Sequence, residues 1–286
     1  MPAATHTWRD ELRDQVRGLS GGLLFGIPLL FTMEVWWVGA HTSVRQLAGL
    51  LALTFVVVVV LNRVASFRSE EDHTIADALF DAVDAVAMGL LVSLLVLVVI
   101  REVGPDVPPA EGLSKVIYHG LTASIGVALA GQFFHGAKDV ADGDDGGDGG
   151  DQGELLGTVV DLGATALGVI FVASAIAPTD EIPMIEAVTA PGWLLVVVGF
   201  SLAASYCVVF VSGFANQEQR RLQKGVLQHP VTETVVAYLV SLLVCGVLLV
   251  IYQRIDLAGS WQLWLPDVVL LGLPGAIGGA AGRLAV

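Results

Sequence analysis

The chain has 286 residues, of which 55% are hydrophobic and only 15% are charged, and its mean hydropathy is +0.74. Soluble domains carry roughly a quarter charged residues, so this composition excludes an ordinary soluble domain and a disordered chain. The 14 Lys and Arg residues against 28 Asp and Glu give a net charge of −14. A nucleic-acid partner is excluded as well, because nucleic-acid binders need a basic surface.

Apolar runs long enough to cross a bilayer occur eight times along the chain, since a span needs about 20 helical residues. The runs are continuously apolar and show no alternation of period two, which excludes the strands of a β-barrel. The expected spans lie near residues 19–39, 46–66, 77–100, 113–134, 155–177, 191–214, 232–252 and 263–284. The predicted fold class is therefore an all-α, polytopic membrane protein with eight transmembrane helices.

The distribution of Lys and Arg predicts how these spans are oriented. With the amino terminus inside, ten basic residues fall on the inner side and four on the outer side. Cytoplasmic loops carry the excess of basic residues, so we expect a protein of the cell membrane with both termini in the cytoplasm. Tryptophans favour the headgroup layer, and five of them fall at the expected outer ends. These are Trp36, Trp37, Trp193, Trp261 and Trp264.

A low-complexity segment, DGDDGGDGGDQGE at 142–154, separates the fourth and fifth spans. Glycine and aspartate at this density cannot bury enough apolar surface to offset the entropy of ordering. We therefore expect a disordered cytoplasmic linker over 135–154, after a cytoplasmic segment at 1–18. The linker divides the membrane part into two four-helix halves, 19–134 and 155–286.

Three short matches, in the same order, suggest that these halves are internal repeats. VIYHGLTASIGVALAG from Val116 and VVLLGLPGAIGGAAGR from Val268 share six of sixteen residues at a separation of 152. VSLLV recurs after 148 residues, at Val92 and Val240, and TMEV at 32–35 has a counterpart, TDEI, 147 residues later. Short apolar matches also arise by chance. An even number of spans in each half predicts two parallel repeats.

Small residues spaced four apart predict close helix packing in the fourth and eighth spans. They are Gly120 and Ser124 in the first half, and Gly275, Gly278, Gly279 and Gly282 in the second. In the alternative interpretation, these helices line a pathway in which the small side chains leave room.

Carboxylates within or beside the spans are the candidate functional groups, because a charge at membrane depth costs several kcal/mol. Glu34 and Glu181 occupy matching positions of the two halves. Glu181 and its neighbour Asp180 lie between Pro178 and Pro183, where we expect the fifth helix to break and free backbone carbonyls. Such a pair could bind an inorganic cation through oxygen ligands or carry a proton. Alternatively, both carboxylates mark solvated helix ends.

Further acidic residues lie at the helix entrances on the cytoplasmic side. The spacing of Asp77, Asp81 and Asp84 places them on one face of the third span. Together with Glu233 they are candidates for a vestibule that attracts cations, or they form ion pairs with basic residues of the inner loops. Glu186 and Asp267 fall in or beside expected outer loops, and we expect them to be solvated.

Enzyme and cofactor motifs are absent from the sequence. There is no phosphate-binding loop, dinucleotide fingerprint, HExxH or GxSxG pattern, so we expect neither an enzyme nor a bound cofactor. The two cysteines, Cys207 and Cys245, lie in apolar stretches and are read as small buried hydrophobes. The expected surroundings of the chain are the lipid bilayer; neither a metal ion nor an oligomeric state is assigned.

The segments FGIPLLFTMEVWW and ASAIAPTDEIPMI resemble a family of prokaryotic integral membrane proteins of unknown function, found in bacteria and archaea. This resemblance implies a multi-pass membrane fold and supplies no functional residue. Two hypotheses follow from the residues themselves. The first is a secondary transporter or channel for a cation or a proton-coupled small solute; the second is a membrane scaffold or sensor that recruits a cytoplasmic partner.

Overall fold

The architecture is that of a helical bundle in a computed structural model that describes residues 8–69, 74–133, 151–212, 229–256 and 259–284. All regular secondary structure of these residues is helical. Six helices are long and apolar enough to cross a membrane, and two further pairs of helices meet this test only as bent pairs. The expectation of a polytopic helical protein is confirmed, with six to eight candidate spans.

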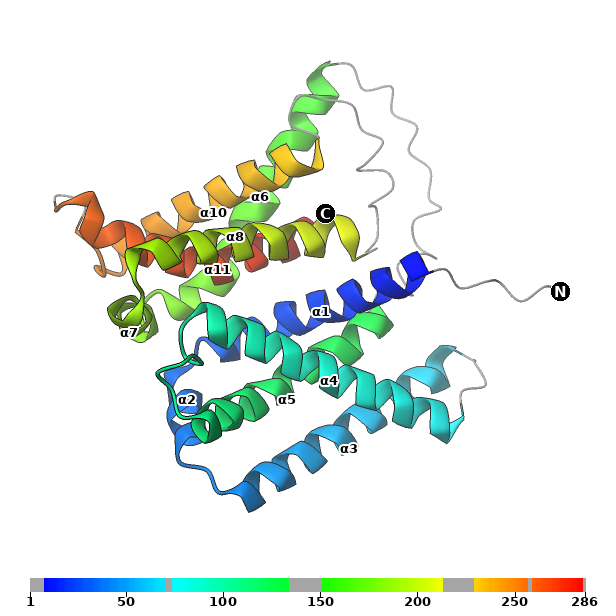
Figure 1. The fold of residues 1–286 in the computed structure, drawn as a ribbon. Coiled ribbons are helices and arrows are strands. Elements are labelled where there is room, and N and C mark those ends of the chain that lie inside the picture. Colours follow the sequence, from blue (N-terminus) through cyan, green and yellow to red (C-terminus); the bar gives the residue numbers. More distant parts are fainter. Residues whose placement is uncertain (1–7, 70–73, 134–150, 213–228, 257–258, 285–286) are drawn as a thin grey trace.

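The first half of the chain begins with a long helix that turns sharply into a short one (Figure 1). Helix α1, Trp8–Leu30, is followed after a bend of 87° by α2, Met33–Ala40. Three long helices then run back and forth along the bundle. They are α3 (Val44–Ser69), α4 (Ile75–Val99) and α5 (Pro109–Phe133).

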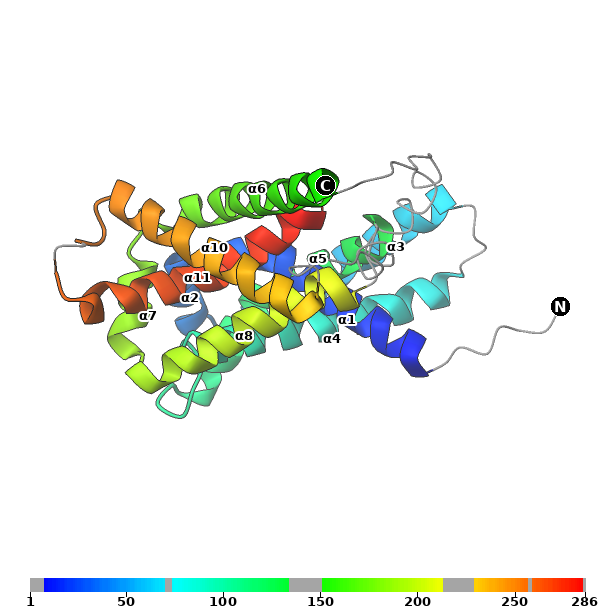
Figure 2. The ribbon, with the colours of Figure 1, turned by 90° about the horizontal axis from the view of Figure 1, so that it is seen from above.

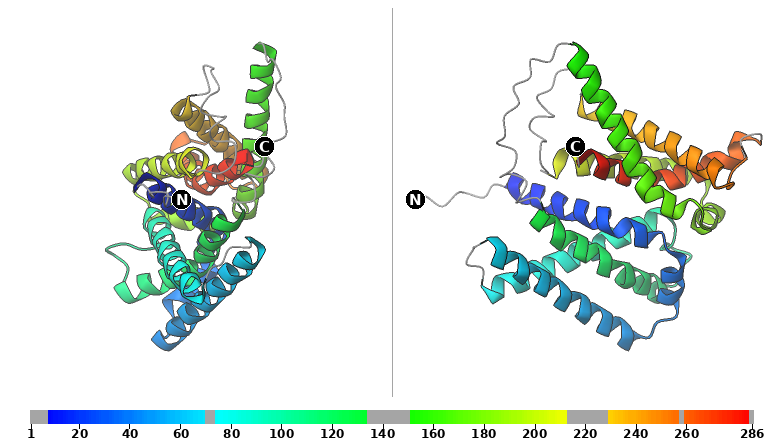
Figure 3. Two further views of the ribbon diagram at one scale, coloured as in Figure 1. Left: turned by 90° about the vertical axis from the view of Figure 1, so that its right-hand side faces the viewer. Right: turned by 180° about the vertical axis from the view of Figure 1, so that it is seen from behind.

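The second half follows the same order of elements. Helix α6, Asp151–Ile176, bends by 84° into the short α7, Glu181–Val188. The remaining elements are η1 (Pro191–Trp193), α8 (Leu194–Tyr206), the π-helical turn η2 (Cys207–Val211), α10 (Pro230–Ile251) and α11 (Trp261–Leu284). The views from above and from the sides show the two halves next to each other, with their long helices running in the same general direction (Figures 2 and 3).

The expected first span, 19–39, is wrong as one helix, because the chain turns between Leu30 and Met33. Thr32 has extended backbone angles, φ −113° and ψ 106°, which end the helical path. The bend frees the carbonyl of Leu30, and the indole Nε1 of Trp36 donates a hydrogen bond to it at 3.0 Å. The buried tryptophan therefore satisfies the group that the broken helix leaves without a partner.

Most of the other boundaries differ by a few residues from the expectations, and the start of α1 differs by more. The expected break near Pro178 and Pro183 is present between α6 and α7. Helix α1 starts at Trp8, well before the expected residue 19, and α6 starts at Asp151, inside the expected linker. The rest of that linker, 135–150, lies outside the described residues.

The same helix pairs are in contact in both halves. In the first half α5 packs against α1, α3 and α4, and in the second half α11 packs against α6, α8 and α10. The last helix of each half is thus the centre of its own bundle. The largest buried apolar cluster joins the halves and includes Ile27, Trp36 and Leu97 from the first with Ile176, Ile185 and Leu270 from the second.

Glycines make the closest contacts inside each half. A methyl group on Gly126 would lie 2.5 Å from the backbone oxygen of Gly21, and one on Gly278 would lie 2.5 Å from that of Gly168. The first contact thus lets the backbones of α5 and α1 touch, and the second does the same for α11 and α6. The glycines of the first contact are 147 and 152 residues from those of the second, which are two of the separations found in the sequence.

The contact between α4 and α5 and the contact between α10 and α11 are also made by residues that lie 152 apart in the sequence. Leu90 covers Gly120 in the first half, and Leu242 covers Gly272 in the second. The VSLLV match, with its separation of 148, is therefore one helical turn out of register with the contacts.

The small residues singled out in the sequence lie at helix contacts. Ser124 packs on Gly89 of α4, and Gly282 lies against the backbone of Ala164 in α6. Gly275 packs against the side chain of Cys245, and Gly279 packs against the side chains of Thr165 and Ser241.

Candidate cation site at the helix breaks

The two bent pairs place α2 and α7 at the same end of the molecule, the left end in Figure 1. We call it the short-helix end, and it consists of α2, α7, the segment 100–108 that follows α4, and residues 252–256 and 259–260 that follow α10. The start of α1 and the end of α11 lie toward the opposite end. The acidic residues predicted as ligands follow the two breaks, so they all lie at the short-helix end.

Glu181 is the buried member of the three predicted ligands, with only 5% of its surface exposed. It is the first residue of α7, and its Oε1 accepts a hydrogen bond of 3.4 Å from the backbone N–H of Met33, the first residue of α2. Glu181 thereby caps the N-terminus of a helix from the other half, which favours a negative charge. Its Oε2 is buried and has no hydrogen-bond partner among the described residues.

Glu34 and Asp180 have different surroundings from Glu181. Glu34 is exposed in the first turn of α2. Asp180 is also exposed, and its Oδ1 accepts a hydrogen bond of 2.6 Å from Arg254, which donates to the backbone oxygen of Thr179 as well. The breaks thus bring the three acidic residues to one end, but no described contact joins their carboxylates.

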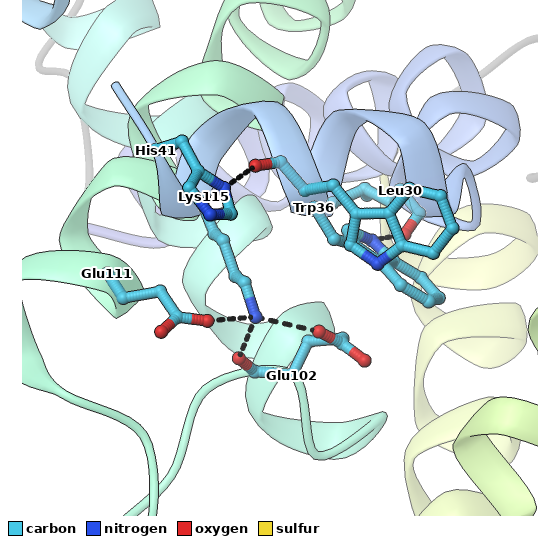
Figure 4. A network of polar contacts seen from close by, with 7 residues as sticks. Leu30, Trp36, His41, Glu102, Glu111 and Lys115 are labelled. Carbon is cyan, nitrogen blue, oxygen red and sulfur yellow. Dashed lines mark hydrogen bonds and ion pairs between the residues drawn. The ribbon is translucent and has the colours of Figure 1, made fainter. Parts of the chain in front are cut away.

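A buried lysine of this end was not recognised from the sequence. The ammonium group of Lys115 in α5 contacts Glu102 Oε2 and Glu111 Oε1, each at 2.9 Å, and the backbone oxygen of Glu102 at 3.4 Å (Figure 4). Its side chain is only 8% exposed, and Gly39 of α2 packs on it. The signal available in the sequence was the acid four residues before Lys115, a spacing that favours an ion pair.

Asp267 is buried, so the expectation that it is solvated in an outer loop is wrong. It lies in the second turn of α11, against which α7 packs, and only 9% of its surface is exposed. Its Oδ1 is buried without a hydrogen-bond partner among the described residues. Glu186, half-buried on α7, and Arg254 are both close enough to act on its charge.

The acidic residues at the opposite end have structural partners. Asp77 accepts hydrogen bonds from Thr74 and closes a capping box at the start of α4, and Asp81 and Asp84 are exposed on the same helix. Glu233 forms an ion pair with Arg283, whose side chain is 2% exposed. The predicted vestibule is therefore an exposed acidic stretch of α4, and Glu233 is engaged by a buried arginine.

Several polar side chains inside the first half also have a buried atom without a hydrogen-bond partner among the described residues. They are Ser20, Ser93, His119 and Thr122. His119 is fully buried one turn after Lys115, and neither ring nitrogen has such a partner. The sequence indicated no partner for this histidine. The interior of the first half therefore contains polar groups that packing alone does not require.

Comparison with known families agrees with this membrane architecture. Residues 14–286 match a family model described as "Putative integral membrane protein (DUF2391)". The chain belongs to this family. The resemblance found in the sequence is thereby confirmed, and the lipid bilayer is the environment of this integral membrane protein. No curated protein and no solved structure matches the chain.

Proposed function

We propose that this family member is a transporter or channel, without enzymatic activity, for a cation or a proton-coupled small solute. Its binding group is the carboxylate of Glu181. The observation that supports this assignment is the buried, unpartnered Oε2 of Glu181 at a break between two helices. Ionisable groups at such positions in membrane proteins mark ion sites and proton relays, and broken helices supply further backbone ligands.

The surroundings of Glu181 suit reversible binding of a positive charge. Oε1 accepts a long hydrogen bond from the backbone N–H of Met33, which orients the carboxylate. Oε2 remains available as a ligand or a proton acceptor. The bond to Met33 also joins the two halves, so a change of charge on Glu181 would act directly on the contact between them.

The proposed topology has eight spans, each bent pair counting as one, in the cell membrane. Both termini then lie on the same side, which the excess of Lys and Arg assigns to the cytoplasm. We further propose that the halves are parallel repeats. The glycine contacts at separations of 147 and 152, and the matching order of helices, support this relation.

Flux through reconstituted vesicles tests the assignment of Glu181. Proteoliposomes would be loaded with a pH-sensitive dye and exposed to a panel of cations, with and without a pH gradient. We expect Glu181→Gln to abolish the flux of the wild type, because glutamine can still accept the bond from Met33 but carries no charge. Asp106→Asn, which alters an exposed acid of the same end, is the matched control.

The variant Glu34→Gln tests whether Glu34 contributes to binding as Glu181 does. Because Glu34 is exposed, we expect this variant to retain most of the flux. Undiminished flux in Glu181→Gln would refute the assignment. Absence of flux in the wild type across the whole panel would refute transport and leave the scaffold or sensor as the remaining hypothesis.

Site-directed labelling tests the topology. Cysteines would be introduced at Glu11 in α1 and Gln262 in α11, both exposed and at opposite ends, after Cys207 and Cys245 are replaced by alanine. We expect a membrane-impermeant maleimide to label the residue 262 cysteine in intact cells and the residue 11 cysteine only in inverted vesicles. Labelling of both from one side would exclude this topology.

A further inference from the structure

Buried charges of opposite sign occupy corresponding positions at the short-helix end. Lys115 of α5 and Asp267 of α11 are 152 residues apart, and so are Glu102 and Arg254. This is the separation of the Gly126 and Gly278 contacts. The acid Glu102 thus corresponds to the base Arg254, and the base Lys115 corresponds to the acid Asp267.

The position in the first half is filled by the chain itself. The ammonium group of Lys115 has three N–H donors and three oxygen acceptors within 3.4 Å: two carboxylates and one backbone carbonyl. These acceptors come from Glu102 and Glu111 (Figure 4). A tethered cation therefore neutralises the carboxylates around it.

The position in the second half contains a carboxylate that accepts no hydrogen bond from such a tethered cation among the described residues. Asp267 Oδ1 has no hydrogen-bond partner among the described residues, and nine-tenths of the residue is buried. Arg254 is close enough to act on the charge of Asp267, but it donates its hydrogen bonds to Asp180 and to the backbone of Thr179. A second acid, Glu186, is half-buried on α7, the helix that packs against α11. It is 147 residues from Gly39, which packs directly on Lys115 in the first half.

We propose that Asp267 and Glu186 bind a small ammonium cation, ammonium itself or a primary alkylamine. The cation takes the place in the second half that the side-chain ammonium of Lys115 takes in the first. An ammonium group needs only a few hydrogen-bond acceptors, whereas a bound metal ion needs a fuller set of ligands. The described residues contain no group of three or more His, Cys, Asp or Glu side chains that could hold a metal. This site depends on neither Glu181 nor transport.

Binding to the purified full-length protein in detergent tests the inference. Calorimetric titration and the apparent Tm would be measured with ammonium or methylammonium chloride at constant ionic strength. Sodium, potassium and tetramethylammonium chloride are the comparison salts, since none of their cations has an N–H donor. We expect saturable binding of one ammonium or methylammonium per chain, with a rise in Tm that the comparison salts do not produce.

Three variants and one control variant locate the site. Asp267→Asn and Glu186→Gln should each weaken ammonium binding at least tenfold, and the half-buried Glu186 keeps the test open if Asp267→Asn fails to fold. Lys115→Ala should bind a second ammonium, between Glu102 and Glu111. The exposed Asp106→Asn should bind as the wild type does.

The proposal is overturned by absence of ammonium binding in the wild type. It is equally overturned by equal stabilisation from sodium or potassium, or by unchanged binding in both Asp267→Asn and Glu186→Gln. Because flux through Glu181 is measured separately, loss of one proposal leaves the other intact.

Discussion

Replacing Gly278 by alanine tests the close packing of α11 on α6. The new methyl group would lie 2.5 Å from the backbone oxygen of Gly168 and 2.8 Å from Cβ of Val172. Real Cβ atoms essentially never approach other atoms within 3.0 Å, so the helices must separate by at least half an ångström. Overpacking of this kind costs about 1–3 kcal/mol.

Gly163→Ala is the matched control, because Gly163 lies in α6 and a methyl group there meets no atom within 4 Å. Both substitutions bring the same gain in helix propensity, about 0.5–1 kcal/mol, so their difference isolates the contact. The assay is thermal unfolding of the detergent-solubilised protein, monitored by size-exclusion chromatography. One kcal/mol corresponds to roughly 2–4 °C in chains of 150–250 residues, so we expect Gly278→Ala to lower the Tm by several degrees. Equal Tm values for the two variants would refute the packing argument.

Three more substitutions test polar contacts by the same assay. Arg283→Met should cost about 2–4 kcal/mol, since it leaves the carboxylate of Glu233 largely buried without its cation, and Arg283→Met/Glu233→Met should recover most of the loss. Lys115→Met should destabilise by a similar amount, about 2–4 kcal/mol, with partial recovery in Lys115→Met/Glu102→Gln. Trp193→Phe removes the hydrogen bond of its indole to the backbone of α4 and should cost about 1 kcal/mol. If one of these single substitutions leaves the protein as stable as the wild type, the contact that it removes does not stabilise the fold as argued.

The helices could be predicted from the sequence because apolar runs of span length have few alternatives in a bilayer. Proline content predicted the break between α6 and α7 but not the one between α1 and α2. Helix α11 continues through Pro266 and Pro274, whereas α1, with Pro28, ends two residues later. At the break after Pro28, the indole of Trp36, six residues farther along the chain, satisfies the carbonyl of Leu30.

The candidate site shows the same limit. Glu181 was identified because two prolines flank it and mark a break. Asp267 was judged solvated because hydropathy places it near a span end, but α7 lies across that end and buries it. Lys115 was overlooked for the same reason. Local patterns indicate the depth of a residue along its own helix, whereas burial depends on helices that arrive from elsewhere in the chain.

The contacts within each half and between the halves differ in kind. Inside a half, backbone atoms touch at glycines, as Gly278 does with Gly168. Between the halves, the hydrogen bonds among the described residues run from Arg17 to Ser212, from Met33 to Glu181 and from Trp193 to α4, with apolar side chains between them. Each of these bonds joins a side chain to a backbone group. A change in the angle between the halves would therefore break a few such bonds and slide apolar surfaces, while each half moves as a rigid body.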